Sequence, residues 1–334
     1  MNKAIREYLK AGGTLGSLGK LPKGRKASAP FPCDPAKVYA KQVDALTLRL
    51  TRIGVKDVVI GVSGGLDSAL ALLVAVGAYR KLNLPLAGIH AYTMPGFGTS
   101  TRTKTNADLL CEGLGLGLET ISIAKSVRQH LKDIGHDGKT ADLTYENAQA
   151  RMRTLILMDK ANMTHGIVLG TGDMSEIALG WCTYNGDHMS MFGVNAGVPK
   201  TVVRKVCAWY ATMNTASRKV SHALLDIVAT PVSPELVKGQ VTEDKLGPYE
   251  LHDFFIWNFC RNGLMRKALY DAAAKRFGRT YELGLIGKTL DTFLYRIVSQ
   301  AFKRNCAPDG IKVFSFDFSK ESWSIPSDLP AGWL

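Results

Sequence analysis

The sequence predicts a doubly wound α/β fold, in which a parallel sheet carries helices on both faces, with a helical C-terminal part after it. Three observations predict this class. Short apolar runs rich in β-branched residues recur through the first half of the chain, as expected for strands buried on both faces. Segments with helical spacing separate these runs, and such alternation favours a parallel sheet. After Pro199 only helical patterns remain.

The predicted elements follow one another in a regular order. Apolar residues recur at helical spacing from Pro35 to Leu50, and the first strand comes shortly after them. The expected strands are residues 57–62, 86–92, 118–123 and 166–170. The expected helices are residues 35–50, 69–82, 103–114, 145–162, 200–213, 216–228, 249–261, 264–276 and 283–304. The interval Thr230–Pro248 carries prolines and charges, so we expect a long loop there that closes as a lid.

The composition favours a globular protein with anionic partners. The chain of 334 residues has a formal net charge of +13, and hydrophobic residues make up 46% of it. The positive charge suits nucleotides, phosphates or nucleic acid. Before residue 30 the basic residues face only one acid, Glu7. We therefore expect residues 1–35 to be a basic extension, part of it disordered, before a domain at residues 36–334. A solvated tail is the simplest interpretation of this extension, with a nucleic-acid arm or a targeting segment as the alternative.

Several classes of protein are disfavoured. No apolar run approaches the roughly 20 residues that a membrane-spanning helix needs. The N-terminus has no apolar core of the kind found in secretory signals. The six cysteines are scattered without a C-x-x-C pair, which argues against a zinc or iron–sulfur site. Ordinary reduced thiols in a cytoplasmic protein are the simplest account.

The strongest motif joins the first strand to the helix after it and reads Val59-Ile-Gly-Val-Ser-Gly-Gly-Leu-Asp-Ser68. Its glycines allow the backbone to approach an anion with N–H groups turned inward. The helix that follows directs its positive end to the same place, and Ser63 and Ser68 add hydroxyl donors. The carboxylate of Asp67 would repel a phosphate, so it predicts a bridging Mg²⁺. The motif therefore predicts a cradle for phosphate groups.

Further motifs identify the family that this cradle resembles. Its spacing differs from a Walker A loop and from G-x-G-x-x-G. The Ser-Gly-Gly-x-Asp-Ser pattern after a strand resembles the PP-loop of ATP-pyrophosphatases, which implies an adenine nucleotide alpha hydrolase-like fold. Gly170-Thr-Gly-Asp-Met-Ser-Glu-Ile-Ala-Leu-Gly-Trp-Cys-Thr-Tyr184 closely resembles a segment of glutamine-dependent NAD synthetases. Other segments resemble the same family in the same order: Ala91–Asn106, Thr144–Thr154, Asn195–Lys200, Gly247–Phe255, Phe302–Arg304 and Pro326–Asp328. The resemblance covers about residue 36 to the end.

The resemblance implies roles for individual residues. Asp67, Ser63, Ser68 and Lys200 would carry the catalytic chemistry, and Asp67 and Glu176 would hold Mg²⁺. ATP would be bound by Gly61, Val62, Ser63, Gly64, Gly65, Leu66, Asp67, Ser68, Thr171 and Lys200. Deamido-NAD would be bound by Asn147, Arg151, Arg153, Glu176, Trp181, Cys182, Thr183, Tyr184 and Lys303. Within these sets, Lys200 and Lys303 are expected to neutralise phosphates.

Some of these residues also have plainer interpretations. Arg151 and Arg153 lie two residues apart on a helix and point in different directions, so only one of them is expected to reach the dinucleotide. Which of the two does so stays open. Trp181 and Tyr184, at positions i and i+3 of a predicted helix, would be core aromatics if taken alone. His252 is expected to be structural.

The implied reaction is the amidation of deamido-NAD to NAD, with ATP as co-substrate and an NAD-adenylate as intermediate, releasing AMP and pyrophosphate. The glutamine-dependent members of the family also carry an N-terminal glutaminase domain. Only about 35 residues precede the synthetase region here, too few for such a domain. We therefore expect ammonia as the nitrogen donor, either free or supplied by a separate glutaminase. The resemblance also implies a homodimer.

Two other functions compete with this interpretation. Another PP-loop ATP-pyrophosphatase, such as a tRNA-modifying enzyme, would suit the basic charge. The sequence has no C-x-x-C pair and no recognisable RNA-binding module, so specific nucleic-acid binding is not expected. A nucleotide-binding protein without catalysis is disfavoured because the predicted carboxylates Asp67 and Glu176 are both present.

Overall fold

The computed structural model describes residues 3–22, 25–213, 216–233, 236 and 242–330. Its sheet has five parallel strands in the order β3-β2-β1-β4-β5. They are Val58–Gly61 (β1), Ile89–Thr93 (β2), Leu118–Thr120 (β3), Ile167–Gly170 (β4) and Phe192–Gly193 (β5). The chain builds from β1 to β3 on one side and then crosses to β4 on the other. The carboxyl ends of β1 and β4 therefore flank the switch point, where open α/β sheets bind ligands.

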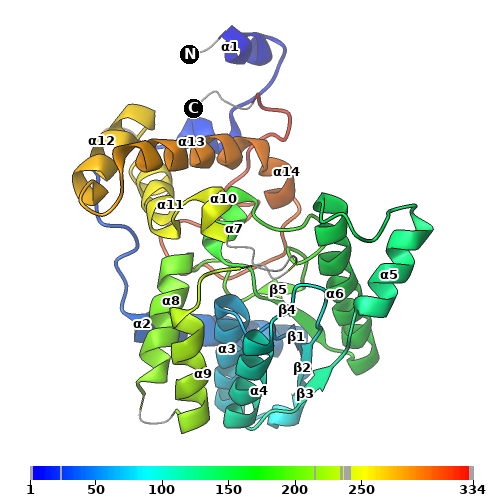
Figure 1. The fold of residues 1–334 in the computed structure, drawn as a ribbon. Coiled ribbons are helices and arrows are strands. Elements are labelled where there is room, and N and C mark those ends of the chain that lie inside the picture. Colours follow the sequence, from blue (N-terminus) through cyan, green and yellow to red (C-terminus); the bar gives the residue numbers. More distant parts are fainter. Residues whose placement is uncertain (1–2, 23–24, 214–215, 234–235, 237–241, 331–334) are drawn as a thin grey trace.

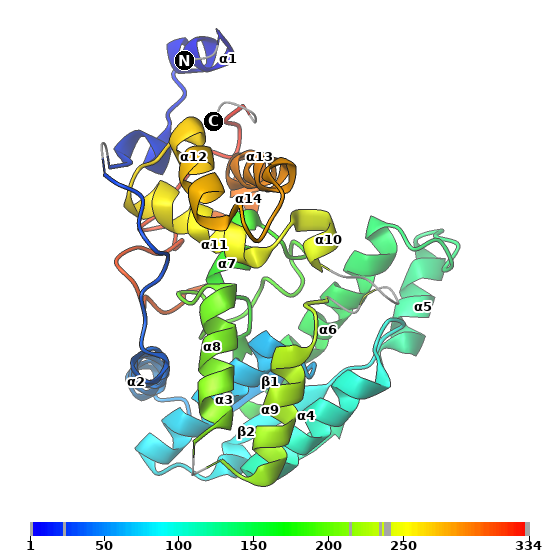
Figure 2. The same cartoon turned by 60° about the vertical axis from the view of Figure 1, so that its left-hand side comes forward.

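Helices cover both faces of the sheet, as Figures 1 and 2 show. The strand side chains alternate between two cores, because Ile60 belongs to the larger core and Val59 to the smaller. The helices of the first face are α2 (Pro35–Ile53), α3 (Leu66–Leu82), α4 (Thr101–Leu114), α8 (Lys200–Ala211) and α9 (Arg218–Ala229). The helices of the second face are α5 (Ala124–Asp133) and α6 (Leu143–Thr164). The predicted doubly wound class is confirmed.

A group of helices lies beyond the carboxyl ends of the strands (Figure 1). The short helix α7, which follows β4, packs against α8, α11, α13 and α14. The elements of this group are α7 (Met174–Leu179), α10 (Thr242–Leu246), α11 (Tyr249–Ile256), the π-helical turn η3 (Trp257–Arg261), α12 (Arg266–Phe277), α13 (Leu283–Ser299) and α14 (Ala301–Arg304). Within the expected lid, residues 234–235 and 237–241 lie outside the described residues, and α10 forms part of its remainder.

The described part of the N-terminal extension packs on these C-terminal helices. Its elements are α1 (Lys3–Lys10) and the 3₁₀ turn η1 (Gly16–Lys20). Phe31 is 2% exposed and packs edge-on against Trp257 and Phe314. Ser28 is held through hydrogen bonds with Asn258, and Tyr8 donates a hydrogen bond to Asp328. Apolar side chains of this segment, Ile5, Leu18 and Phe31, join the main core. The expected disorder of part of the extension stays a prediction.

Several element boundaries differ from those predicted. Leu86–Gly88, expected within the second strand, form a 3₁₀ turn (η2) directly after Pro85. The third strand ends at Thr120 instead of residue 123. The strand β5 and the helix α5 were not predicted. The two residues of β5 are too few to show a periodic pattern. Within the described residues, no helix combines the length and apolar character needed to cross a membrane.

Candidate active site

The loop after β1 leads directly into α3, whose N-cap is Gly65. Gly64 has a φ of 84°, and a Cβ there would collide with the carbonyl of Thr103, so only glycine fits. The hydroxyls of Ser63 and Ser68 lie 3.0 Å apart, and Ser68 Oγ also accepts from the N–H of Ser63 at 3.2 Å. The N–H groups of the first turn of α3 have no acceptor within the helix. The loop therefore has the form of the predicted phosphate cradle.

Two residues of the loop shape it through packing. The N–H of Val62 donates to the carbonyl of Tyr92 at 2.8 Å and so extends the pairing of β1 with β2. The side chains of Val62 and Leu66 are 1% and 5% exposed. Their side chains thus belong to the core under the cradle. The expected contacts of both residues with ATP stay a prediction.

The segment after β4 approaches the same place. Asp173 is the N-cap of α7 and forms a capping box with Glu176: its side chain accepts from the N–H of Glu176 at 2.9 Å, and the Glu176 carboxylate accepts from the N–H of Asp173. The amide of Asn195 donates to the carbonyls of Thr171 and Asp67 at 3.0 and 2.9 Å. Asn195 therefore ties the segment after β4 to the segment after β1.

A buried ion cluster lies where the two segments meet. The Lys200 ammonium is 2.6 Å from Asp67 Oδ2, 2.7 Å from Asp173 Oδ2 and 2.8 Å from Glu176 Oε1. Lys200 is 1% exposed. The carboxylates of the site balance the charge of Lys200. Its expected role towards the phosphates of ATP stays a prediction.

In this cluster, burial and the neighbouring charges shift the pKa values of the side chains in opposite directions. Burial disfavours the Lys200 ammonium, but the surrounding Asp173, Asp67 and Glu176 outweigh it and hold its pKa well above the usual value. Burial raises the pKa of Glu176 to about 7, although Lys200 counteracts the shift. The Glu176 carboxylate is thus poised to gain from any further positive charge that binds beside it.

The carboxylates have the character of a Mg²⁺ site. One oxygen each from Asp67, Asp173 and Glu176 lies within 4.8 Å of the others. Asp67 Oδ1 is buried without a hydrogen-bond partner among the described residues. When all three carboxylates are ionised, three negative charges face the one positive charge of Lys200. Carboxylate oxygens are ligands that Mg²⁺ prefers, so these residues fit the predicted ion.

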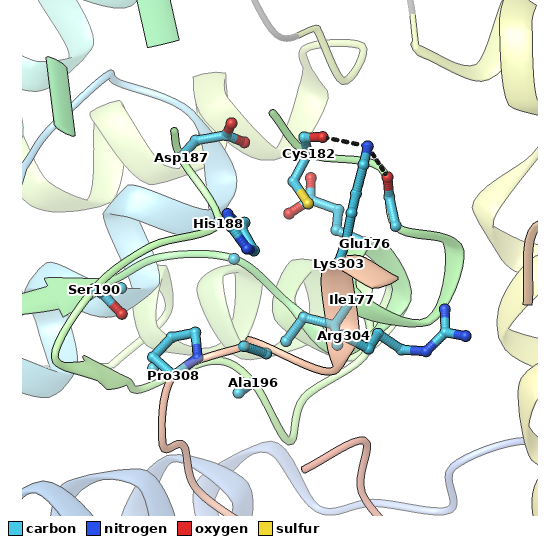
Figure 3. Close-up of a pocket in the computed structure, with 15 residues that line it drawn as sticks. Glu176, Ile177, Cys182, Asp187, His188, Ser190, Ala196, Lys303, Arg304 and Pro308 are labelled. Atoms are coloured by element: carbon cyan, nitrogen blue, oxygen red, sulfur yellow. Dashed lines mark hydrogen bonds between the residues drawn. The ribbon is translucent and has the colours of Figure 1, made fainter. Parts of the chain in front are cut away.

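A pocket opens beside the cluster, between α7, the segment after it and α14 (Figure 3). Glu176, Cys182, Asp187, His188 and Lys303 are among the residues that line it. The carboxylate of Asp187 accepts a hydrogen bond from the N–H of Thr183 at 2.7 Å. Burial lowers the pKa of His188, so its ring is neutral at pH 7. The residues that line the pocket thus include the carboxylates of Glu176 and Asp187 and the cations of Lys303 and Arg304.

Three cations from α13 and α14 hold the segment between the cluster and this pocket. Lys303 donates to two carbonyls, at 2.9 and 2.7 Å, as the dashed lines in Figure 3 show. Arg296 and Arg304 donate to neighbouring carbonyls. Together they contact the carbonyls of Ala178, Leu179, Gly180 and Cys182. Lys303 thus fixes the wall of the pocket. Its expected role of neutralising a phosphate stays a prediction.

The aromatic residues after α7 are not on one helix, contrary to the prediction. Gly180 adopts a φ of 55° and ends α7 before them. Trp181 lies under the guanidinium of Arg296, 5.1 Å from its carbon to the ring centre. Tyr184 is 37% exposed and stacks on His188. Trp181 is therefore a packing contact here, whereas Tyr184 is accessible.

Helix α6 places its three predicted substrate residues at different points. The carboxamide oxygen of Asn147 accepts from the hydroxyl of Thr183 at 2.8 Å. Arg151 donates to the carbonyl of Tyr184 at 3.1 Å, whereas Arg153 donates to a carbonyl just after β2 at 3.0 Å. The two arginines therefore point in different directions, as their spacing predicted. Asn147 and Arg151 approach the segment that leads into the pocket.

Four residues of the site were missed by sequence reasoning. Asp173 could have been found, because Asp-x-x-Glu before an apolar stretch is a capping-box pattern. Asn195 lies in a matched segment, but no pattern shows that it bridges two loops. Arg304 depends on a contact with α7 far away in the sequence. Asp187 lies four residues after its partner Thr183, in a segment without a periodic pattern.

Comparison with known proteins places the chain in a family. The model of the NAD synthase family matches residues 38–275. The glutamine-dependent NAD(+) synthetase of Mycobacterium leprae is 39% identical over 344 residues, covering 91% of this chain and 51% of the relative. That of Mycobacterium tuberculosis is 38% identical over 343 residues, covering 91% and 50%. The chain thus spans about half the length of the curated relatives it matches.

Solved structures share the fold. A glutamine-dependent NAD(+) synthetase from Cytophaga hutchinsonii has a TM-score of 0.71 at 18% identity, covering 87% of this chain and 53% of the other. An NH₃-dependent NAD synthetase from Campylobacter jejuni has a TM-score of 0.55 at 24% identity, covering 81% and 96%. At these identities the likeness concerns the fold alone. The fold, the cradle and the family model agree, and the chain belongs to the NAD synthase family.

Proposed function

We propose that this chain amidates deamido-NAD to NAD at the expense of ATP, which is cleaved to AMP and pyrophosphate. One observation carries the proposal: a phosphate cradle and a cluster of three carboxylates with a buried lysine meet at the switch point, beside a pocket. ATP would lie over the cradle with its phosphates against the first turn of α3. The nicotinate end of deamido-NAD would enter the pocket lined by Glu176, Asp187 and Lys303.

The chemistry in this proposal is mainly electrostatic. The nicotinate carboxylate is ionised at pH 7 and attacks the α-phosphorus without a base, so the obstacle is the approach of two anions. Mg²⁺ held by Asp67, Asp173 and Glu176 would supply positive charge that offsets this repulsion. The cradle amides and the Lys200 ammonium hold the departing pyrophosphate. Ammonia then attacks the carbonyl carbon of the adenylate, AMP leaves, and the extra proton of the new amide passes to solvent.

We further propose ammonia as the nucleophile in this site. Attack on an acyl adenylate needs a neutral nitrogen with a free electron pair. The relatives named above are glutamine-dependent, and the chain spans about half of their length. The donor is decided by assay: ammonium and glutamine are offered separately as the sole nitrogen source. We expect NAD from ammonium, and efficient NAD formation by the purified chain from glutamine alone would contradict the proposal.

The proposed function is tested by measuring NAD from deamido-NAD, ATP and ammonium with Mg²⁺ present. The Asp67→Asn variant should lose about 100-fold or more in rate, since it removes one electrostatic contact made at the reacting phosphate. The matched control is Asp291→Asn, an exposed carboxylate paired with Arg266 far from the cluster. Full activity in Asp67→Asn, or none in the parent chain, would refute the proposal.

We also propose that the chain forms a homodimer through α6. Only Ala148, Gln149, Ala150 and Ala161 of this helix are buried. Leu155 and Met163, about two turns apart, are 55% and 74% exposed. Large apolar side chains exposed along one helix are a feature of surfaces that another chain covers. This face therefore supports association of two copies.

A further inference from the structure

Helix α11 carries the matched segment Gly247–Phe255, to which neither the cradle nor the pocket assigns a role. Asp253, in the middle of this helix, is fully buried. Its carboxylate accepts from the hydroxyl of Ser175 on α7. It also accepts from the N–H of Thr201 at 2.9 Å and from the Thr201 hydroxyl at 2.6 Å, both on α8. One carboxylate of α11 thus joins the first turns of two other helices.

These contacts complete the N-terminus of α8. Its N-cap is Pro199, which forms no side-chain cap, and the first N–H groups of a helix have no acceptor within it. The N–H of Lys200 donates to Ser175 Oγ at 2.9 Å, and that of Thr201 donates to Asp253. Ser175 and Asp253 therefore accept hydrogen bonds from the first N–H groups of α8, as the side chain of an N-cap Ser or Asp does for its own helix. They set the point at which the Lys200 side chain leaves the backbone.

The same helix contacts the other end of Lys200. Tyr249 precedes Asp253 by four residues, so both lie on one face of α11. The Tyr249 ring centre is 5.3 Å from the Lys200 ammonium, close enough for a cation–π interaction. Tyr249 itself is 3% exposed. Helix α11 thus restrains both ends of Lys200. Asp253 fixes the start of α8, where the Lys200 backbone lies, and the Tyr249 ring contacts the ammonium group.

We propose that Asp253 is a positioning residue for Lys200: through Ser175 and Thr201 it fixes the start of α8 so that the ammonium lies among the three carboxylates. This inference rests on the function proposed above. A lysine held in place before ATP binds needs no rearrangement when negative charge develops. A misplacement of about 1 Å at a reacting centre lowers the rate about 100-fold.

A double-mutant cycle tests whether Asp253 acts through Lys200. The variants are Asp253→Asn, Lys200→Met and the two combined. Ser175 and Thr201 donate to different oxygens of Asp253. In Asp253→Asn one of these oxygens becomes an NH₂ that cannot accept, so one of the two contacts that anchor α8 is lost. We expect kcat to fall about 100-fold while the KM for deamido-NAD stays near the parent value. In the Lys200→Met background the same change should cause no further loss. Equal losses in both backgrounds would overturn the proposal.

The same variants are then compared by their dissociation constants for Mg²⁺–ATP. Calorimetry measures these constants even where catalysis is lost. Asp253→Asn should weaken binding in the parent chain and leave it unchanged when Lys200 is Met. If Asp253→Asn does not fold, Ser175→Ala removes the same anchor with a smaller change and is expected to follow the same pattern. Additive effects in the binding cycle would likewise overturn the proposal.

The control variant is His252→Asn, the neighbour of Asp253 on α11. His252 is fully buried and hydrogen-bonds to the carbonyl of Leu246, so it takes no part in the anchor formed with Ser175 and Thr201. The His252→Asn variant should keep kcat near the parent value even where the midpoint of its thermal unfolding falls. A loss of kcat equal to that of Asp253→Asn would show a general disturbance of α11 and contradict the proposal. If the parent chain binds Mg²⁺–ATP but forms no NAD, the proposed function fails and the binding cycle still decides the role of Asp253.

Discussion

Lys200 shows what sequence can and cannot predict at the scale of single residues. Its motif predicted a functional position, because the lysine lies within a long pattern that matches a family. Its partners were not predictable, since Asp67, Asp173 and Glu176 reach it from loops after two different strands. The types of residue in the site were thus readable, but their pairing depends on the order of strands in the sheet.

His252 is a buried histidine outside the proposed chemistry, as its position on an amphipathic helix predicted. It is fully buried, and its Nε2 donates to the carbonyl of Leu246 at 2.9 Å. Burial lowers its pKa from 6.5 to about 4. The folded chain therefore keeps the ring neutral at pH values where the unfolded chain binds a proton.

This lowered pKa gives a stability prediction with a definite sign. The contribution of neutral His252 is complete above about pH 6.5 and is lost as the pH falls towards 4, because only the unfolded chain gains the proton. Between pH 7 and 4.5 the parent chain should lose about 2 kcal/mol more unfolding free energy than His252→Asn. Urea unfolding at both pH values measures the difference. Equal losses in the two proteins would show that His252 does not titrate in this way.

At the scale of elements, α7 connects the ion cluster to the pocket. Its first turn carries Asp173 and Glu176, and the carbonyls at its end are held by cations from α13 and α14. The N-terminal capping box was visible in the sequence. The cations at the other end were not, because their separation from α7 exceeds 100 residues along the chain. Local patterns could therefore have predicted one end of this element only.

The buried Arg304 gives a prediction for this element. It is 2% exposed and donates to the carbonyls of Ala178 and Ile297. Arg304→Met would leave these carbonyls without their donors in a buried place, at a cost of about 1–3 kcal/mol of unfolding free energy. Denaturant unfolding measures the loss. The exposed Arg279 on the same group of helices serves as the control, and an equal loss in Arg279→Met would contradict this account.

At the scale of the whole molecule, the fold class and most elements followed from hydrophobic periodicity. The parallel strands were recognisable because each is a short run buried on both faces. The packing of the N-terminal residues was not, since Phe31 lies in a segment rich in lysine, glycine and proline. Its place among Trp257, Phe314 and Phe316 is a tertiary contact without a periodic signal.

The proposed homodimer is tested by light scattering on the purified chain. We expect a mass twice that of the 36.3 kDa chain. Leu155→Glu should shift it to the monomer, because it places a charge in the exposed apolar face of α6. Leu48→Glu on α2 is the matched control, since Leu48 is 56% exposed and Leu155 is 55% exposed. A monomeric parent chain, or dissociation by Leu48→Glu alone, would refute the proposed interface.

The central claim is that this site activates a carboxylate by forming an adenylate. Oxygen labelling tests it most directly, with deamido-NAD carrying ¹⁸O in both oxygens of its nicotinate carboxylate. One of these oxygens bonds to the α-phosphorus as pyrophosphate leaves, and it departs with AMP when ammonia attacks. The account predicts one labelled oxygen in each AMP formed with NAD, measured by mass spectrometry. Unlabelled AMP, or formation of ADP and phosphate instead, would contradict it.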